Sequence, residues 1–261
     1  MHDSPLSDPF PLGTEQVSDY QEQGHLYVPG VISAEAVRTF RSRIYALVER
    51  LGRGVLHSYI RDDFGGKFLE LTNVWRLDPE LRELTFARRF ARMAAELLQV
   101  PSVRLHYDCI LFKEEGGGPT PWHQDQLAWP LDTEHTITMW MPLSDIPSEI
   151  GSLSFLTGSH RLGKASMLDA VRQNLPEVSY GAMKAGDATF HSGWTFHAAK
   201  GNPMKRTRDV FAIVYYADGA VLTAPGTEAY RQEHLNKFFP GQKPGEAAAS
   251  ELNPLLWDNQ P

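Results

Sequence analysis

The run Pro121-Trp122-His123-Gln124-Asp125-Gln126 places a histidine and an aspartate two positions apart. On a β-strand, side chains at positions i and i+2 point to the same face of the sheet. If this run is a strand, His123 and Asp125 can share one metal ion. A third candidate ligand follows later, at His191 or at His197. Gly193 indicates a bend between these two histidines, and spacing alone does not choose between them.

Two imidazoles and one carboxylate on one face of an ion are typical of non-haem Fe(II) oxygenases, because the opposite face stays open. A lone histidine is usually a surface or core residue, and the chain has ten of them. A zinc hydrolase can also use two histidines and a carboxylate. The pattern therefore needs support from other parts of the chain.

Further support comes from Asn202, Arg206 and Arg208, which precede an apolar run from Val210 to Val214. An arginine that enters a strand beside a metal can hold a carboxylate through two parallel hydrogen bonds, a geometry that lysine does not match. For one of the two arginines, a solvated basic loop is an equally good explanation. The other is a candidate for binding an organic acid.

The composition fits an ordinary globular protein: 261 residues, 42% hydrophobic and 22% charged, with a net charge of −7. This charge gives no indication of nucleic-acid binding. The one cysteine, Cys109, fits a reducing compartment. No signal peptide and no apolar run of about 18 residues is present. We expect a cytoplasmic protein with a small-molecule substrate, without a nucleic-acid or membrane partner; the oligomeric state does not follow from the sequence.

The predicted secondary structure changes from helical to extended near Pro101. Apolar residues recur at helical spacing before this point and alternate with polar residues after it, without intervening βαβ helices, which favours an antiparallel sandwich or barrel. We predict one domain of 1–261, mainly β with flanking N-terminal α-helices. Its parts are a loose arm at 1–12, a helical flank at 14–100, a β core at 101–218 and a C-terminal tail at 219–261.

Several separate segments resemble the phytanoyl-CoA dioxygenase family of Fe(II)- and 2-oxoglutarate-dependent oxygenases, in the right order over roughly residues 14–220. In chain order they are Gly24-His25-Leu26-Tyr27-Val28-Pro29-Gly30-Val31, Trp122-His123-Gln124-Asp125-Gln126, Trp140-Met141-Pro142-Leu143, Gly151-Ser152-Leu153-Ser154-Phe155-Leu156-Thr157-Gly158-Ser159-His160 and Gly186-Asp187. His197, with Asn202 and Arg208 after it, has the spacing of the family's distal histidine and arginine. The resemblance therefore favours His197 over His191, and Arg208 over Arg206.

The resemblance implies a double-stranded β-helix (jelly-roll, cupin-like) core, with Fe(II) as cofactor and 2-oxoglutarate and O2 as co-substrates. It implies that His123, Asp125 and His197 are the iron ligands and catalytic residues. Arg208 resembles the arginine that binds 2-oxoglutarate. Family halogenases have a small residue in place of the ligand carboxylate, so Asp125 disfavours halogenation.

Two further residues match co-substrate positions of the family, although each has a structural alternative. Lys113 matches a lysine near the co-substrate in some members, and a solvated lysine at a strand end explains it as well. Trp140 corresponds to a tryptophan of the co-substrate pocket, and a core tryptophan would look the same.

The implied activity is a dioxygenase that hydroxylates an unactivated C–H bond of a small metabolite and releases succinate and CO2. Desaturation, epoxidation or cyclisation at the same site is an alternative, and so is a non-catalytic, metal-containing jelly-roll binding module. No motif identifies the substrate. His57, Arg61, Lys67 and Arg76 are candidates to hold an anionic one.

Overall fold

The structure is a computed structural model that describes residues 6, 8–56 and 67–259. The α-helices are α1 (Thr14–Gln23), α2 (Ala34–Leu56), α3 (Pro79–Thr85), α4 (Arg88–Leu98), α5 (Met167–Arg172) and α6 (Ala229–Phe238). The 3-10 turns are η1 (Val74–Arg76), η2 (Asp125–Leu127) and η3 (Ser159–Leu162). The strands are β1 (His25–Val28), β2 (Phe68–Thr72), β3 (Ser102–Lys113), β4 (Thr120–His123), β5 (Thr136–Pro142), β6 (Ser154–Leu156), β7 (Glu177–Ser179), β8 (Ala188–Ser192), β9 (His197–Ala199), β10 (Arg208–Ala217) and β11 (Leu255–Asp258).

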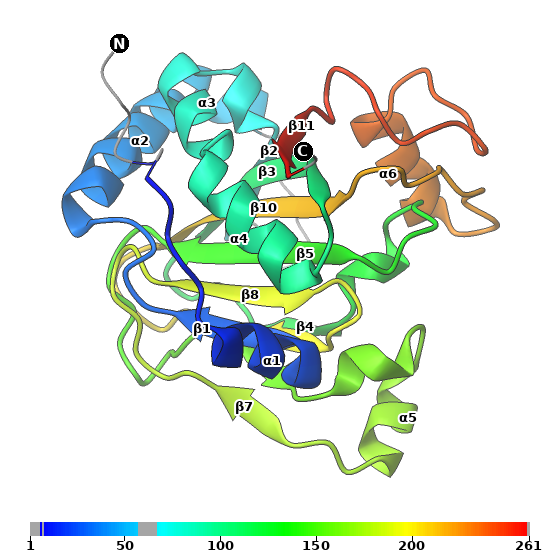
Figure 1. Ribbon diagram of the computed structural model, residues 1–261. Helices are drawn as coiled ribbons and strands as arrows, with labels where there is room; N and C mark the ends of the chain where they lie inside the picture. The colour runs from blue at the N-terminus through cyan, green and yellow to red at the C-terminus, as the bar shows by residue number, and fades with distance from the viewer. Residues whose placement is uncertain (1–5, 7, 57–66, 260–261) are drawn as a thin grey trace.

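The strands form two antiparallel sheets. The seven-stranded sheet has the order β1-β8-β5-β10-β3-β11, and β2 also pairs with β3. The four-stranded sheet has the order β4-β9-β6-β7. Helices α2, α3 and α4 cover one side of the larger sheet, and β4 and β7 lie on the other side (Figure 1). This arrangement confirms the predicted jelly-roll core with flanking N-terminal helices.

The main core lies between the helices and the larger sheet, and β10 shows how the sequence builds it. Side chains of a strand alternate between the two faces of a sheet. Phe211, Ile213 and Tyr215 are fully buried in the cluster that includes the helices. Val210 and Val214 alternate with them and line a cavity between the two sheets. A continuous apolar run in β10 thus supplies the core on one face and the cavity floor on the other.

The ends of the N-terminal helices follow local signals in the sequence. The Asp78 carboxylate accepts hydrogen bonds from the backbone N–H groups of Glu80 and Leu81, at 2.9 and 3.3 Å, and so caps α3. Pro79 begins that helix, where a missing N–H costs nothing. Thr14 has a side chain that could cap α1, but the capping residue is Gly13, and Thr14 is the first residue of the helix.

The start of β9 differs from what the sequence pattern indicates. The residues from Trp194 to Ala198 favour a strand, but β9 begins only at His197. The Thr195 backbone N–H donates to the Ser192 carbonyl at 2.9 Å, which makes a turn of the residues around Gly193. A side chain on Gly193 would also meet Thr136 and Trp129 at under 3 Å. The turn and the close packing at Gly193 therefore move the start of β9 to His197.

The C-terminal tail is ordered against the β core, which the sequence did not indicate. Strand β11 pairs with β3, and Leu235 and Phe238 of α6 are buried with Trp129 and Tyr216. In the described part of the chain, no helix is long and apolar enough to cross a membrane.

Candidate metal and co-substrate site

His123 and His197 face each other across the β4–β9 strand pair, with ring centroids 4.1 Å apart. The Nδ1 atom of His123 lies 2.8 Å from the Pro121 carbonyl, and that of His197 lies 3.0 Å from the Thr195 carbonyl. A carbonyl oxygen can only accept, so each Nδ1 carries the hydrogen and donates it. Each Nε2 then keeps its lone pair, which is the form of histidine that binds a metal.

A turn, and not a strand, brings Asp125 to these imidazoles. Strand β4 ends at His123, and Asp125 begins η2. Our prediction that the two residues share a strand face was therefore wrong. The Asp125 Oδ1 atom lies 3.4 Å from His123 Nε2 and 3.6 Å from His197 Nε2. One donor atom from each residue lies within 4.8 Å of the others, close enough for one metal ion.

Two buried glutamines brace the turn on either side of Asp125. The Gln124 amide donates to the carbonyls of Gly163 and Trp194, at 2.8 and 2.7 Å. The Gln126 amide donates to the Thr133 carbonyl at 3.1 Å, and its oxygen accepts from Thr136. Buried side-chain amides whose hydrogen bonds are satisfied make the local structure rigid. Gln124 and Gln126 therefore hold the Asp125 carboxylate in place. Sequence reasoning missed this role, because the partners of these amides cannot be identified from the sequence.

The charges in the cluster suit a cation. Burial opposes ionisation of Asp125, but the neighbouring His197, together with the nearby rings of His123 and His191, lowers the pKa of Asp125 well below its usual range. Burial, followed by the proximity of His123, lowers the pKa of His197 well below its usual range. A carboxylate and neutral imidazoles are the protonation states in which these groups bind metals.

The structure also distinguishes His191 from His197. His191 is buried, and its Nε2 lies 3.4 Å from Asp125 Oδ2. A carboxylate can only accept, so this nitrogen carries a hydrogen and has no lone pair for a metal. The three-residue donor cluster found among the described residues contains His197 and not His191. The geometry therefore supports the choice that the resemblance favoured.

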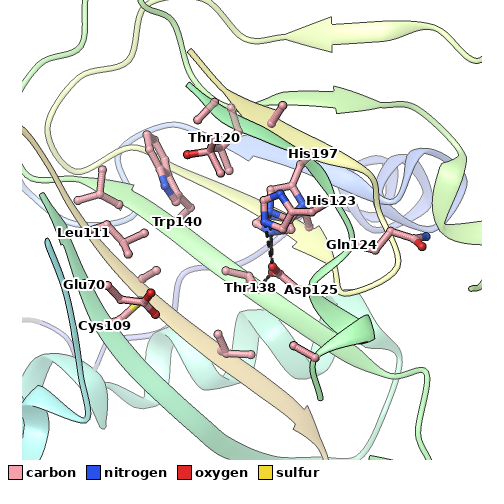
Figure 2. Close-up of a pocket in the computed structure, with 18 of the residues that line it drawn as sticks. Glu70, Cys109, Leu111, Thr120, His123, Gln124, Asp125, Thr138, Trp140 and His197 are labelled. Carbon is pink, nitrogen blue, oxygen red and sulfur yellow. Dashed lines mark hydrogen bonds and ion pairs between the residues drawn. The ribbon is translucent and has the colours of Figure 1, made fainter. Parts of the chain in front are cut away.

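A cavity of about 620 Å³ opens beside the donor cluster, between the two sheets. Its lining is mostly apolar, and Figure 2 shows the imidazoles of His123 and His197 together with Trp140, Leu111 and Thr138. A volume of this size holds small organic molecules. Tyr230 and His234 of α6 also line it, so the C-terminal tail contributes to the wall.

Arg208 begins β10 and lines the same cavity. Its side chain is 5% exposed, and burial lowers the pKa of its guanidinium to about 10. One of its nitrogens donates to the Lys200 carbonyl at 3.4 Å, while Nε makes no hydrogen bond to any described residue. A buried, incompletely satisfied guanidinium favours a bound anion, so the residue fits the carboxylate of an organic acid.

Trp140 and Lys113 both lie near Arg208, but only Trp140 lines the cavity. Trp140 lines the cavity, and the Arg208 guanidinium lies 5.9 Å from the centre of its ring. Lys113 is fully buried, so the solvated strand-end alternative is wrong. Its Nζ donates to Thr120 Oγ1 at 3.0 Å, and it is not among the described residues that line the cavity. Burial and the charge of Arg208 lower the pKa of Lys113 to about 7.

Arg206 points away from this site and donates to the Asp145 carbonyl at the surface. Asn202 is buried, and its amide donates to the carbonyls of Lys113 and Arg206, both at 2.7 Å. Asn202 thereby holds the loop before β10 against β3. The asparagine between His197 and Arg208 in the sequence therefore has a structural role, because it fixes the loop that carries Arg208 into β10.

The residues suggested for an anionic substrate receive no support from the structure. Lys67 and Arg76 are described, and neither is among the residues that line the cavity. His57 and Arg61 lie outside the described residues.

A jelly roll in which two imidazoles and a carboxylate line one cavity is the arrangement of non-haem, metal-dependent oxygenases. The sequence model described as phytanoyl-CoA dioxygenase (PhyH) matches residues 20–210. The chain therefore belongs to the phytanoyl-CoA dioxygenase family of Fe(II)- and 2-oxoglutarate-dependent oxygenases.

Related proteins carry out different reactions. The non-haem alpha-ketoglutarate-dependent carbocyclase SnoK from nogalamycin biosynthesis superposes with a TM-score of 0.80 and is 28% identical, over 95% of this chain and 99% of that chain. The epimerase SnoN, in complex with Fe3+, alpha-ketoglutarate and nogalamycin RO, gives a TM-score of 0.77 and 25% identity, over 93% of this chain and 97% of that chain.

A protein of Stutzerimonas stutzeri described as a probable alpha-ketoglutarate-dependent hypophosphite dioxygenase is 26% identical over 154 residues. The match covers 56% of this chain and 53% of that protein, so the chain spans about half the length of this relative.

Proposed function

We propose that this protein is an Fe(II)- and 2-oxoglutarate-dependent dioxygenase that hydroxylates an unactivated C–H bond of a small organic metabolite. One observation supports this above others. The donor cluster of His123, Asp125 and His197 and the buried guanidinium of Arg208 line one cavity. A zinc hydrolase would need the donor cluster alone, and Arg208 would then have no role.

In this proposal His123, Asp125 and His197 hold the iron through the two free Nε2 atoms and one carboxylate oxygen. Arg208 binds the distal carboxylate of 2-oxoglutarate beside Trp140. When bound, the iron would use O2 and 2-oxoglutarate to supply an oxidant for C–H bonds, and 2-oxoglutarate would be converted to succinate and CO2. The residues of the chain contribute geometry, an open coordination face and a cavity that excludes water.

The apolar walls serve this last purpose. Val210, Ala212 and Val214 form the floor on β10, and Trp129 and Leu127 line the cavity from the turn after Asp125. None of these side chains carries an easily ionised group, and removal of water prevents side reactions of reactive species. The same walls select a substrate with substantial apolar surface.

A second outcome, cyclisation or epimerisation of the substrate, is favoured by the likeness to SnoK and SnoN over nearly their full lengths. The three ligands do not discriminate among these outcomes, because the position of the substrate relative to the iron decides which bond forms. The product distinguishes them. Hydroxylation adds one oxygen atom, cyclisation or desaturation removes two hydrogens, and epimerisation leaves the mass unchanged.

The test is succinate formation by the purified protein with candidate metabolites, followed by mass spectrometry of the product. We expect substrate-stimulated succinate only when Fe(II), 2-oxoglutarate and O2 are all present. His197→Ala is the matched inactive control. Tight binding of the metal without 2-oxoglutarate binding would instead favour the non-catalytic binding module.

A further inference from the structure

The two oxygen atoms of the Asp125 carboxylate have different surroundings. Oδ1 faces the Nε2 atoms of His123 and His197, at 3.4 and 3.6 Å. Oδ2 accepts a hydrogen bond from Thr138 Oγ1 at 3.1 Å and lies 3.4 Å from His191 Nε2. One oxygen thus points to the candidate metal position, and the other points to donors of the protein.

The donors on Oδ2 come from the larger sheet, whereas His123 and His197 come from the smaller one. Thr138 on β5 and His191 on β8 are direct cross-strand partners in the register of the seven-stranded sheet. Both are buried, and Figure 2 shows Thr138 beside Asp125 on the cavity floor. A neighbouring pair on one sheet therefore holds the carboxylate oxygen that does not face His123 and His197.

The packing around His191 fixes its ring in the orientation that this contact needs. Its ring centroid lies 4.3 Å from that of His197 and 5.5 Å from that of Phe155. The ring is 1% exposed, so it has little room to rotate. A carboxylate oxygen only accepts, so the contact of Nε2 with Asp125 Oδ2 is a hydrogen bond in the Nε2–H form of His191.

We propose that Thr138 and His191 are positioning residues that keep Asp125 a one-oxygen ligand of the metal. This inference rests on the proposed function, because it concerns the same metal. With two imidazoles, one carboxylate oxygen and 2-oxoglutarate bound, the iron would keep an open position for O2. A carboxylate bound through both oxygens would occupy that position. Hydrogen bonds to Oδ2 prevent this, because they make that oxygen less available to the ion.

The test measures metal binding directly, without turnover. Thr138→Val removes the hydroxyl and keeps the shape of the side chain, whereas Thr138→Ser keeps the hydroxyl. His191→Phe removes the N–H and keeps an aromatic ring. Thr189→Val is the matched control, because Thr189 is a buried threonine two residues from His191 whose hydroxyl bonds to no described residue. Circular dichroism and thermal melting of each variant establish that it is folded.

We expect Thr138→Val and His191→Phe to raise the dissociation constant for Co(II), titrated into the metal-free protein, roughly 10-fold each. In the double variant the dissociation constant should rise by less than the product of the two single-variant increases, because both residues bond to the same carboxylate oxygen. The visible spectrum of bound Co(II) should change in both variants, while Thr138→Ser and Thr189→Val should resemble the wild type.

Wild-type Co(II) affinity and an unchanged spectrum in folded Thr138→Val or His191→Phe would overturn the proposal. An equal loss in Thr189→Val would also overturn it, because the effect would then come from packing. A different result would contradict the proposed function: the wild-type protein binds the metal but forms no succinate from 2-oxoglutarate with any candidate metabolite. The two failures are therefore distinguishable.

Discussion

Replacement of Arg208 by alanine should weaken the binding of 2-oxoglutarate and leave the binding of the metal nearly unchanged. Burial lowers the pKa of this guanidinium from 12.5 to about 10, which corresponds to about 3 kcal/mol of cost for holding the charge in the cavity. A carboxylate that pairs with the guanidinium offsets this cost. Loss of the pair should therefore raise the half-saturating concentration of 2-oxoglutarate on the order of 100-fold, and at least about 30-fold.

The assay is succinate formation across a titration of 2-oxoglutarate, with calorimetry of 2-oxoglutarate binding to the metal-loaded protein in the absence of O2. Arg208→Lys should recover only part of the loss, because an ammonium group cannot form two parallel hydrogen bonds. Arg206→Ala is the control, since that side chain bonds to the Asp145 carbonyl at the surface. A large effect in Arg206→Ala together with a small one in Arg208→Ala would refute the assignment of the pocket.

Three further predictions concern the metal ligands and two buried charges. His123→Ala and Asp125→Ala should each abolish Fe(II) binding and succinate formation with little change in circular dichroism; activity at ordinary iron concentration would contradict their assignment. Lys113→Met should raise the melting temperature below pH 7, because burial lowers the pKa of this lysine to about 7 and its protonated form is costly there; it should weaken 2-oxoglutarate binding far less than Arg208→Ala. Burial raises the pKa of Asp108 from 3.8 to about 7, so the stability that its neutral form provides is lost as the pH rises through 7. Asp108→Asn should therefore stabilise the protein by about 3 kcal/mol more at pH 8 than at pH 5 in urea unfolding, and an equal gain at both pH values would refute this.

Local signals in the sequence predicted much of the fold. The cap at Asp78 and Pro79 and the continuous apolar run of β10 each depend on a few consecutive residues, so they can be recognised without a structure. The C-terminal tail lacked such a signal. Helix α6 is stabilised by contacts of Leu235 and Phe238 with residues more than 100 positions away, such as Trp129. Tertiary packing of this kind overrides local propensity.

The sequence indicated which candidate side chains come together but not the geometry that brings them together. The spacing of His123 and Asp125 suggested one face of a strand, whereas the cluster of potential metal donors forms through a 3-10 turn. The buried Gln124 braces that turn, and its amide donates to the carbonyls of Gly163 and Trp194, which lie 39 and 70 positions further along the chain. Such long-range hydrogen bonds leave no periodic trace in a sequence.

The metal-donor residues and one wall of the cavity are held by separate parts of the chain. His123 and His197 are fixed by backbone carbonyls within their own segments, at Pro121 and Thr195, so their orientation does not depend on the cavity walls. The wall at α6, with Tyr230 and His234, belongs to a separate tail segment. Changes there can alter the position of a substrate without disturbing the metal ligands. Relatives named as a carbocyclase and an epimerase share the fold over nearly their whole length, as expected if reaction outcome is determined by the walls and not by the ligands.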